Sequence, residues 1–209
     1  MVCAFGGFAA GLSGAVASPA EAASDTCRQG FVWRQARPSD HVCVFPKVRD
    51  EAARDNRLAW VRRAPGSTRC KVPYVWREAF DGDTVCVPVE TRTRTKSENA
   101  VAGSRQVAAK LWITKYDTGP STYKRVKLNG SNYNFGQVRV YMRYDGGRVW
   151  WSGTATAHAV SGYDGGAWGI ETGRLVCDGQ PNGYAQAQDV VSGVWSARVP
   201  MRVGCQLID

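Results

Sequence analysis

The sequence predicts an α+β protein in which two small disulfide-stapled modules, each a β-hairpin followed by a helix, precede an all-β, immunoglobulin-like sandwich. Three observations predict this fold class. A stretch of 36 residues beginning at Cys27 recurs at Cys70, with thirteen identities and no gap. An even set of six cysteines follows an apolar N-terminal run. The second half of the chain consists of short β-rich runs separated by glycine-containing turns.

The N-terminal run, residues 2–24, is rich in Ala and Gly and contains Ala20-Glu21-Ala22, the form of a signal-peptidase site. We therefore expect residues 1–23 to be a signal peptide and the mature protein to be secreted and extracellular. A membrane anchor is the alternative. It is disfavoured because the apolar run is shorter than the roughly 20 residues that a spanning helix needs, so no transmembrane segment is predicted in the mature chain.

The cysteines predict a disulfide framework. Removal of the signal peptide takes away Cys3 and leaves six cysteines in an exported chain. Two pairs are sixteen residues apart and occupy the same positions in the two copies. The predicted bridges are Cys27–Cys43, Cys70–Cys86 and Cys177–Cys205. No close Cys pair and only two histidines, His41 and His158, are present, so neither a metal nor a cofactor is predicted.

The predicted modules occupy residues 24–64 and 65–105. Each copy shows two short apolar runs around a polar turn and then a helical pattern, which in the first copy starts at Pro46. A unit of about 40 residues buries too little apolar surface to be stable alone. Closing a loop of about 15 residues by a disulfide contributes roughly 3 kcal/mol. Trp33 and Trp76 are predicted to be buried, with a sugar-stacking platform as the alternative.

The modules also share polar side chains. Each has an Arg on the first strand and an Asp in the turn, namely Arg34 with Asp40 and Arg77 with Asp83. We expect each pair to interact across its hairpin, in preference to forming a catalytic or anion-binding site. Asn56 and Asn99 are expected to hydrogen-bond the hairpin backbone.

The first copy, CRQGFVWRQARPSDHVCVFPKVRDEAARDN, resembles a short motif of uncharacterised secreted proteins of high-GC bacteria. The motif is Cys, (Phe/Tyr)-Val-Trp-Arg-(Glu/Gln)-Ala, Asp, Val-Cys-Val, Arg and Asn. The resemblance covers residues 27–105 and implies secretion and a repeat, without implying an activity. The second copy departs from the motif, with Val72-Pro73 in place of Gln29-Gly30.

Residues 106–209 are predicted to form one β-sandwich domain. Turn signals such as Asn129-Gly130 and Asp145-Gly146-Gly147 separate the β-rich runs. The run VKLNGSNYNFGQVRVYM resembles the opening strands of immunoglobulin-like modules in exported bacterial proteins. Cys177–Cys205 is expected to tie the final strand back to the sheet.

The adjacent Trp150 and Trp151 allow a finer prediction, because successive side chains on a strand point to opposite faces. A two-residue turn around Asp145-Gly146-Gly147 places one set in the core: Val138, Val140, Met142, Val149 and Trp151. The other set points outward: Arg139, Tyr141, Arg143, Trp150 and Ser152. The predicted ligand-binding residues are Trp150, Tyr141, Arg139, Arg143 and Arg148. Two alternatives remain, a three-residue loop that reverses the faces and coverage of this face by the N-terminal modules.

The chain has 27 Lys and Arg against 18 Asp and Glu, a formal net charge of +9. For a secreted protein this favours an anionic cell-wall polymer or polysaccharide as partner; nucleic acid is disfavoured because no binding motif occurs. The leading hypothesis is a noncatalytic binding or envelope-associated protein. One alternative is a hydrolase that uses carboxylates such as Glu78, Asp83 or Glu171, although no G-x-S-x-G or H-E-x-x-H motif is present. Another is a structural or inhibitory partner of another exported protein.

Overall fold

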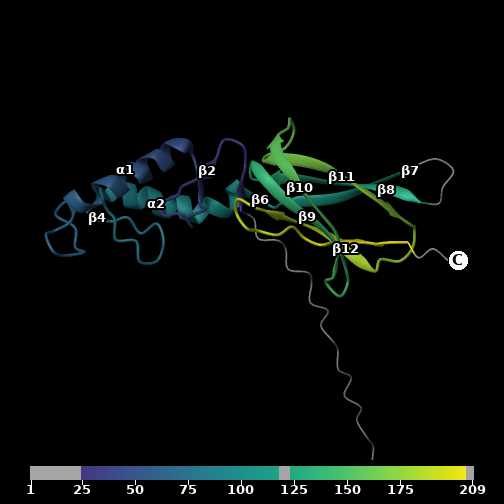
Figure 1. Cartoon of the computed structure of the whole chain (residues 1–209). Helices are drawn as coiled ribbons and strands as arrows, with labels where there is room; N and C mark the ends of the chain where they lie inside the picture. Colours follow the sequence, from purple (N-terminus) through teal and green to yellow (C-terminus); the bar gives the residue numbers. More distant parts are fainter. Residues whose placement is uncertain (1–24, 118–122, 206–209) are drawn as a thin grey trace, which may run out of the picture.

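The computed structural model describes residues 25–117 and 123–205. The predicted signal peptide lies outside these residues. Two helices and their short strands form one part of the molecule, and long antiparallel strands form the other (Figure 1). Neither helix is both long and apolar enough to span a membrane, among the residues described.

The helical part has the same order of elements in both copies of the repeated stretch, a short strand pair and then a helix. The first copy has β2 (Val32–Trp33), β3 (Cys43–Val44) and α1 (Pro46–Arg62); the second has β4 (Val75–Trp76), β5 (Cys86–Val87) and α2 (Val89–Val101), followed by the 3₁₀ helix η1 (Ala102–Arg105). Pro46 is the first residue of α1, where its missing N–H costs no hydrogen bond. The helix thus begins where the sequence predicted it.

All three disulfides have the predicted pairing. Cys27–Cys43 and Cys70–Cys86 join Cα atoms 5.6 and 5.5 Å apart, and both close loops with a sequence separation of 16 residues. Cys177–Cys205 joins the end of the sheet strand that stops at Val176 to the chain after the last strand.

The largest fully buried side chains of the helical part are arginines. Arg34 and Arg77 are each 1% exposed, and each guanidinium makes a two-pronged pair with the Asp of its own hairpin. The Arg34 Nε to Asp40 Oδ2 distance is 2.7 Å, and the equivalent distance from Arg77 to Asp83 is 2.8 Å. This confirms the predicted pairing and makes it the centre of each module.

The remaining donors of these arginines reach into the other module. Arg34 donates to Asn99 Oδ1 at 2.9 Å, and Arg77 donates to Asn56 Oδ1 at 3.0 Å. Each Asn in turn donates to the hairpin backbone of its own module, at Ala36 O and Ala79 O. The predicted Asn–backbone bonds are therefore present, and the same side chains also link the two modules.

Other contacts are reciprocal in the same way. Arg62 of the first module donates to Cys86 O at 3.2 Å, and Arg105 of the second donates to Cys43 O at 3.3 Å. Two pairs of aligned positions even contact each other: the Arg37 guanidinium lies 4.0 Å from the Phe80 ring centroid, and Glu51 pairs with Arg94. Such contacts are those of two units related by an approximate two-fold axis.

Neither tryptophan of the modules is buried, so this prediction was wrong. Trp76 is 42% exposed and Trp33 is half-buried. Each indole N–H instead donates to the backbone just before the first Cys of its module, at Thr68 O and Asp25 O. The interior that the sequence assigned to tryptophan is occupied by the Arg–Asp pairs.

Seven strands form the second part of the molecule: β7 (Lys110–Asp117), β8 (Lys124–Tyr133), β9 (Gly136–Tyr144), β10 (Val149–Ala159), β11 (Gly166–Val176), β12 (Gly183–Asp189) and β13 (Val199–Met201). They make one antiparallel sheet in the order β13-β12-β9-β10-β11-β8-β7. Strand β7 also contacts β12 and β13, so the sheet curls until its two edges approach each other.

The curled sheet encloses the core. Val126, Leu128, Val138, Val140 and Met142 are fully buried there. The sequence predicted two packed sheets, but β10 pairs with β9 along most of its length and with β11 at its end, which joins all strands into one nearly closed sheet.

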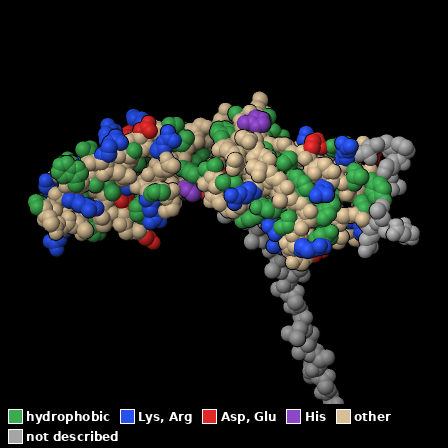
Figure 2. Space-filling view, in the orientation of Figure 1, with side chains coloured by type: hydrophobic (Ala, Val, Ile, Leu, Met, Phe, Trp, Pro, Cys, Tyr) green, Lys and Arg blue, Asp and Glu red, His purple; other side chains and the backbone are tan. Residues whose placement is uncertain are grey.

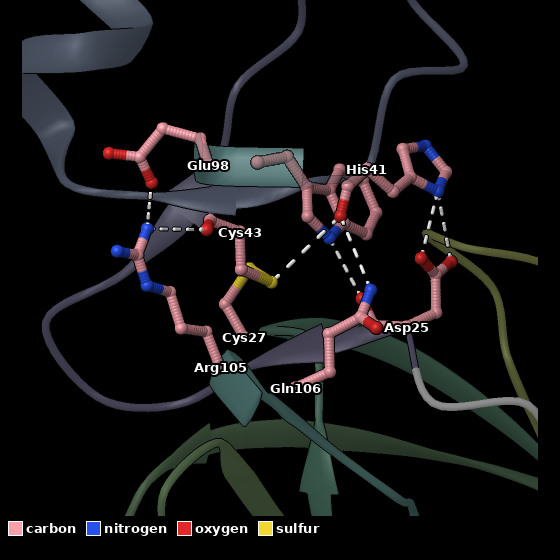
Figure 3. Close-up of a disulfide and its surroundings, with 8 residues drawn as sticks. Asp25, Cys27, His41, Cys43, Glu98, Arg105 and Gln106 are labelled. Atoms are coloured by element: carbon pink, nitrogen blue, oxygen red, sulfur yellow. Dashed lines mark hydrogen bonds and ion pairs between the residues drawn. A yellow bond between two sulfur atoms is a disulfide. The ribbon is translucent and has the colours of Figure 1, made fainter. Parts of the chain in front are cut away.

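A short strand pair connects the two parts. β1 (Thr26–Cys27) pairs with β6 (Gln106–Val107), so the start of the described chain lies beside the exit from the second module. Around the Cys27–Cys43 disulfide, Arg105 reaches Glu98 and Cys43 O, while His41 Nδ1 lies 2.9 Å from Asp25 (Figure 3). Burial raises the pKa of Asp25, and the charge of His41 opposes this shift.

Candidate functional site: an arginine and aromatic face of the sheet

A three-residue loop and a β-bulge together set the positions of the adjacent tryptophans. The register shifts between Val149, which is opposite Arg143, and Trp151, which is opposite Met142. Tyr144 N–H donates to Arg148 O, so residues 145–147 form a three-residue loop, the alternative that reverses the faces of Val149 and Trp150. The extra residue of the bulge then returns Trp151 to the core side. Trp151 packs against the core as predicted, but Trp150 also packs there and Val149 is 44% exposed. The predictions that Trp150 faces outward and Val149 inward were therefore wrong.

The rest of the predicted face is present. Val138, Val140 and Met142 are fully buried, so the alternate residues of β9 point outward. They lie beside polar residues of both neighbouring strands, in the pairs Arg139–Gln188, Tyr141–Gln186, Arg139–Thr154 and Tyr141–Ser152. Arg139, Tyr141 and Arg143 therefore share one outer surface with amide and hydroxyl side chains.

Aromatic side chains that the sequence argument missed complete this surface. Tyr141 lies between Trp195, with ring centroids 5.5 Å apart, and the Arg143 guanidinium, 4.7 Å from its centroid. Tyr184 is opposite Arg143 and is only 8% exposed, because the Arg198 guanidinium covers its ring at 4.3 Å. Trp195 and Arg198 precede β13 in a loop, where no strand alternation assigns a side chain to a face.

We call this surface the arginine face and define it by six residues: Arg139, Tyr141, Arg143, Tyr184, Trp195 and Arg198. None of these side chains is a carboxylate, nor is any of the β10 and β12 residues paired with Arg139 and Tyr141. The guanidinium groups consequently have no acidic neighbour within the face itself. Figure 2 shows that Lys and Arg side chains are spread over both parts of the molecule and outnumber acidic ones on the visible side.

Arg148, the fifth predicted binding residue, lies apart from the arginine face. Its guanidinium is 4.3 Å from the Tyr144 ring centroid at the turn between β9 and β10. Arg143 is held at the same turn, because its Nη1 donates to Gly147 O at 3.0 Å. The turn thus positions Arg143 within the arginine face and carries Arg148 just outside this face.

The N-terminal modules contact the sheet domain elsewhere. Thr26 lies against the backbone of Gly165, and Arg28 is 3.8 Å from Asp164. Among the described residues, the ring and hydrogen-bond contacts of the arginine-face side chains lie within the sheet domain. Coverage by the modules, the alternative considered from the sequence, is therefore not what occupies this surface.

The carboxylates considered for hydrolysis are held by cations or by hydroxyl groups. Asp83 is buried and paired with Arg77. A hydrogen bond from Lys96 and the nearby Arg92 lower the pKa of Glu78, the opposite of what a general acid requires. Glu171 accepts a hydrogen bond from Tyr116 and lies 3.8 Å from Lys127.

Comparisons of the chain with protein-family models, with curated proteins and with solved structures found no match. Any functional assignment therefore depends on the chemistry of the surfaces described above.

Proposed function

We propose that this is a secreted, noncatalytic protein that binds an anionic glycan or cell-wall polymer through the arginine face. The observation that carries the proposal is the combination, on one side of the sheet, of three arginines with the partly exposed rings of Tyr141 and Trp195, and no acidic side chain among the six residues of the face. Guanidinium groups pair with anionic groups, and aromatic faces stack on the apolar faces of sugar rings.

The arrangement on the strands supports an extended ligand. Arg139, Tyr141 and Arg143 alternate along β9, so equivalent atoms recur about 7 Å apart on one face. Gln186 and Gln188 lie alongside them on β12 and carry amide groups that can hydrogen-bond hydroxyls. A polymer of repeating acidic sugars presents charge and hydroxyl groups in a similar linear series.

The three disulfides support the proposed extracellular location, because such bridges persist in oxidising compartments. The signal-peptide pattern in residues 1–23 and the resemblance of residues 27–105 to secreted bacterial proteins favour the same location. We also propose that the sheet domain is related to immunoglobulin-like domains and that the two modules arose by duplication.

A charge-matched pair of variants tests the proposal. The face variant, Arg139→Gln with Arg143→Gln and Arg198→Gln, removes three positive charges from the arginine face. The control variant, Lys47→Gln with Arg54→Gln and Arg57→Gln, removes three from exposed positions of α1. Binding to polygalacturonate and to neutral dextran is measured by sedimentation at several salt concentrations.

We expect wild type and the control variant to retain polygalacturonate at low salt and to release it as salt rises, since exposed charges are screened. The face variant is expected to bind it about tenfold more weakly, a change of about 1.4 kcal/mol. An equal loss of polygalacturonate binding in both triple variants would show that net charge alone drives the interaction and would contradict the proposal. Retention of dextran equal to that of polygalacturonate would contradict it as well.

A further inference from the structure

A pocket of about 310 Å³ lies where the first module meets the sheet domain. Phe31, Val32 and Trp33 contribute apolar surface from the module, and Phe135 contributes it from the sheet domain. Small-molecule sites typically have volumes from about 300 Å³ and prefer junctions of this kind. The pocket is separate from the arginine face, whose six residues do not line it.

The second module carries an equivalent groove. Seven residues line it, and each aligns with a residue of the junction pocket at an offset of 43 positions: Arg69, Cys70, Tyr74, Val75, Trp76, Glu78 and Arg92 correspond to Thr26, Cys27, Phe31, Val32, Trp33, Gln35 and Arg49. The module therefore contributes residues at the same seven aligned positions to both sites. The groove of the second module can therefore be compared directly with the junction pocket.

The first difference between the two sites is a wall. At the junction, the sheet domain adds Tyr133, Asn134, Phe135, Asp164 and Gly165. Arg28 holds Asp164 at 3.8 Å, and Thr26 lies against Gly165, so the wall is fixed to the module. The groove of the second module has no such cover among the residues that the structure describes. Only the junction can enclose a ligand on two sides.

The second difference is a charge. In the second module Glu78 lies 3.6 Å from Arg92 and 2.8 Å from Lys96, so this arginine has a carboxylate partner in its own groove. The aligned residue in the first module is the neutral Gln35. Within the described chain, Arg49 forms an ion pair at 3.8 Å with its exposed neighbour Asp50, which does not line the pocket. The junction pocket thus has an arginine without an acidic partner in the pocket.

We propose that the junction pocket binds a small ring-containing acid. The ring lies between the module aromatics and Phe135, where apolar contact and stacking stabilise it. Its carboxylate takes the place of the missing Glu side chain and pairs with Arg49, and a guanidinium and a carboxylate form two parallel hydrogen bonds. Gln35 and Asn134 supply amide groups for further hydrogen bonds. Aromatic acids and sugar acids share this chemistry.

Four probes test the pocket by isothermal titration calorimetry on the full mature chain: indole-3-acetate, its neutral analogue indole-3-acetamide, glucuronate and glucose. We expect at least one acid to bind with a Kd below about 1 mM and its neutral analogue to bind about tenfold more weakly. Preference for indole-3-acetate identifies an aromatic acid, and preference for glucuronate identifies a sugar acid. No binding of either acid in this range would overturn the proposal.

The aligned module supplies matched variants. Arg49→Gln is expected to weaken acid binding about tenfold, and Arg92→Gln to leave it unchanged. Gln35→Glu places a carboxylate near Arg49, as Glu78 lies near Arg92 in the second module, and is expected to weaken acid binding to a similar degree. Glu78→Gln is its control. The backbone accepts Glu at this position, since Gln35 and Glu78 have φ values of 55° and 59°.

Phe135→Ala removes the wall aromatic, which is 64% exposed, and is expected to weaken both acids and neutral analogues. Trp60→Ala, at a position 77% exposed outside the pocket, is its control. Equal effects of the Arg49 and Arg92 variants, or unchanged acid affinity in Gln35→Glu, would contradict the assignment. An unfolding midpoint measured for each variant separates lost binding from lost folding.

Discussion

At the scale of single residues, the modules depend on buried ion pairs. Arg77 and Asp83 are 1% and 4% exposed, and their hydrogen bonds also connect the backbone at Ala79 and the side chain of Asn56. A buried charge is tolerated only when it is paired and its remaining donors are satisfied. The Arg–Asp pair therefore fixes the hairpin and, through Asn, the position of the opposite module.

Asp83→Asn leaves the Arg77 guanidinium buried without its counter-charge. We expect the free energy of unfolding to fall by about 3–5 kcal/mol, the usual effect of breaking a buried pair. Urea unfolding followed by circular dichroism measures the change. Asp178→Asn, which removes an exposed carboxylate paired with Lys124, is expected to leave the unfolding midpoint unchanged. A similarly small change in the Asp83 variant would contradict the role assigned to the pair.

The Arg–Asp and Asn–backbone contacts were predictable from the sequence, because the partners belong to the same module, 6 and 20 residues apart, and recur in both copies. The destination of the other guanidinium donors was not predictable, since Arg34 and Asn99 are 65 residues apart. The burial of the tryptophans was predicted from size alone. Arginine occupies the interior instead, with each guanidinium nitrogen of Arg34 and Arg77 hydrogen-bonded.

At the scale of elements, short-range patterns predicted hairpins, helices and disulfides, whereas the sheet depends on long-range pairing. Pro46 begins α1, and both sixteen-residue disulfides form as predicted. The three-residue loop at residues 145–147, an alternative that the sequence allowed, turns Trp150 toward the core. The bulge between Val149 and Trp151 carries no local sequence signal, and it returns Trp151 to the same side. Half of the arginine face followed from β9 alternation, and the other half required Tyr184 of β12 and two residues of the loop before β13.

Removing one module disulfide, by Cys70→Ser with Cys86→Ser, is expected to lower the free energy of unfolding by about 3 kcal/mol through the larger entropy of the unfolded chain. Urea unfolding of the variant against oxidised wild type measures this loss. Treatment with a reductant should bring little further change at that site but should destabilise wild type. An unaltered urea midpoint in the variant would show that packing alone holds β4 and β5 together.

At the scale of the whole molecule, the two modules form one hydrogen-bonded unit attached to the sheet domain. Arg62 donates to Cys86 O and Arg105 donates to Cys43 O, so a backbone carbonyl of each hairpin is hydrogen-bonded by a side chain of the other module. β1 pairs with β6 and brings the beginning of the unit to the start of the sheet domain. The junction pocket exists because these hydrogen bonds and the β1–β6 pairing hold the first module beside the sheet domain.

A single module is consequently expected to be unstable. A chain of residues 25–64, oxidised to form Cys27–Cys43, lacks the partners of Arg34 and Arg62 in the second module. Its far-ultraviolet circular dichroism at micromolar concentration should show no helix, while residues 25–107 should show both helices. A helical, monomeric 25–64 chain would contradict the mutual dependence of the modules.

The reciprocal contacts also bear on how such a chain can evolve. Two identical modules on separate polypeptides would satisfy the same hydrogen bonds only by forming a homodimer. Covalent linkage makes that encounter intramolecular, at an effective concentration in the millimolar range for short linkers. Once joined, the halves no longer need to be identical, so Gln35 and Glu78 can differ and one half can specialise while its sibling preserves the shared scaffold.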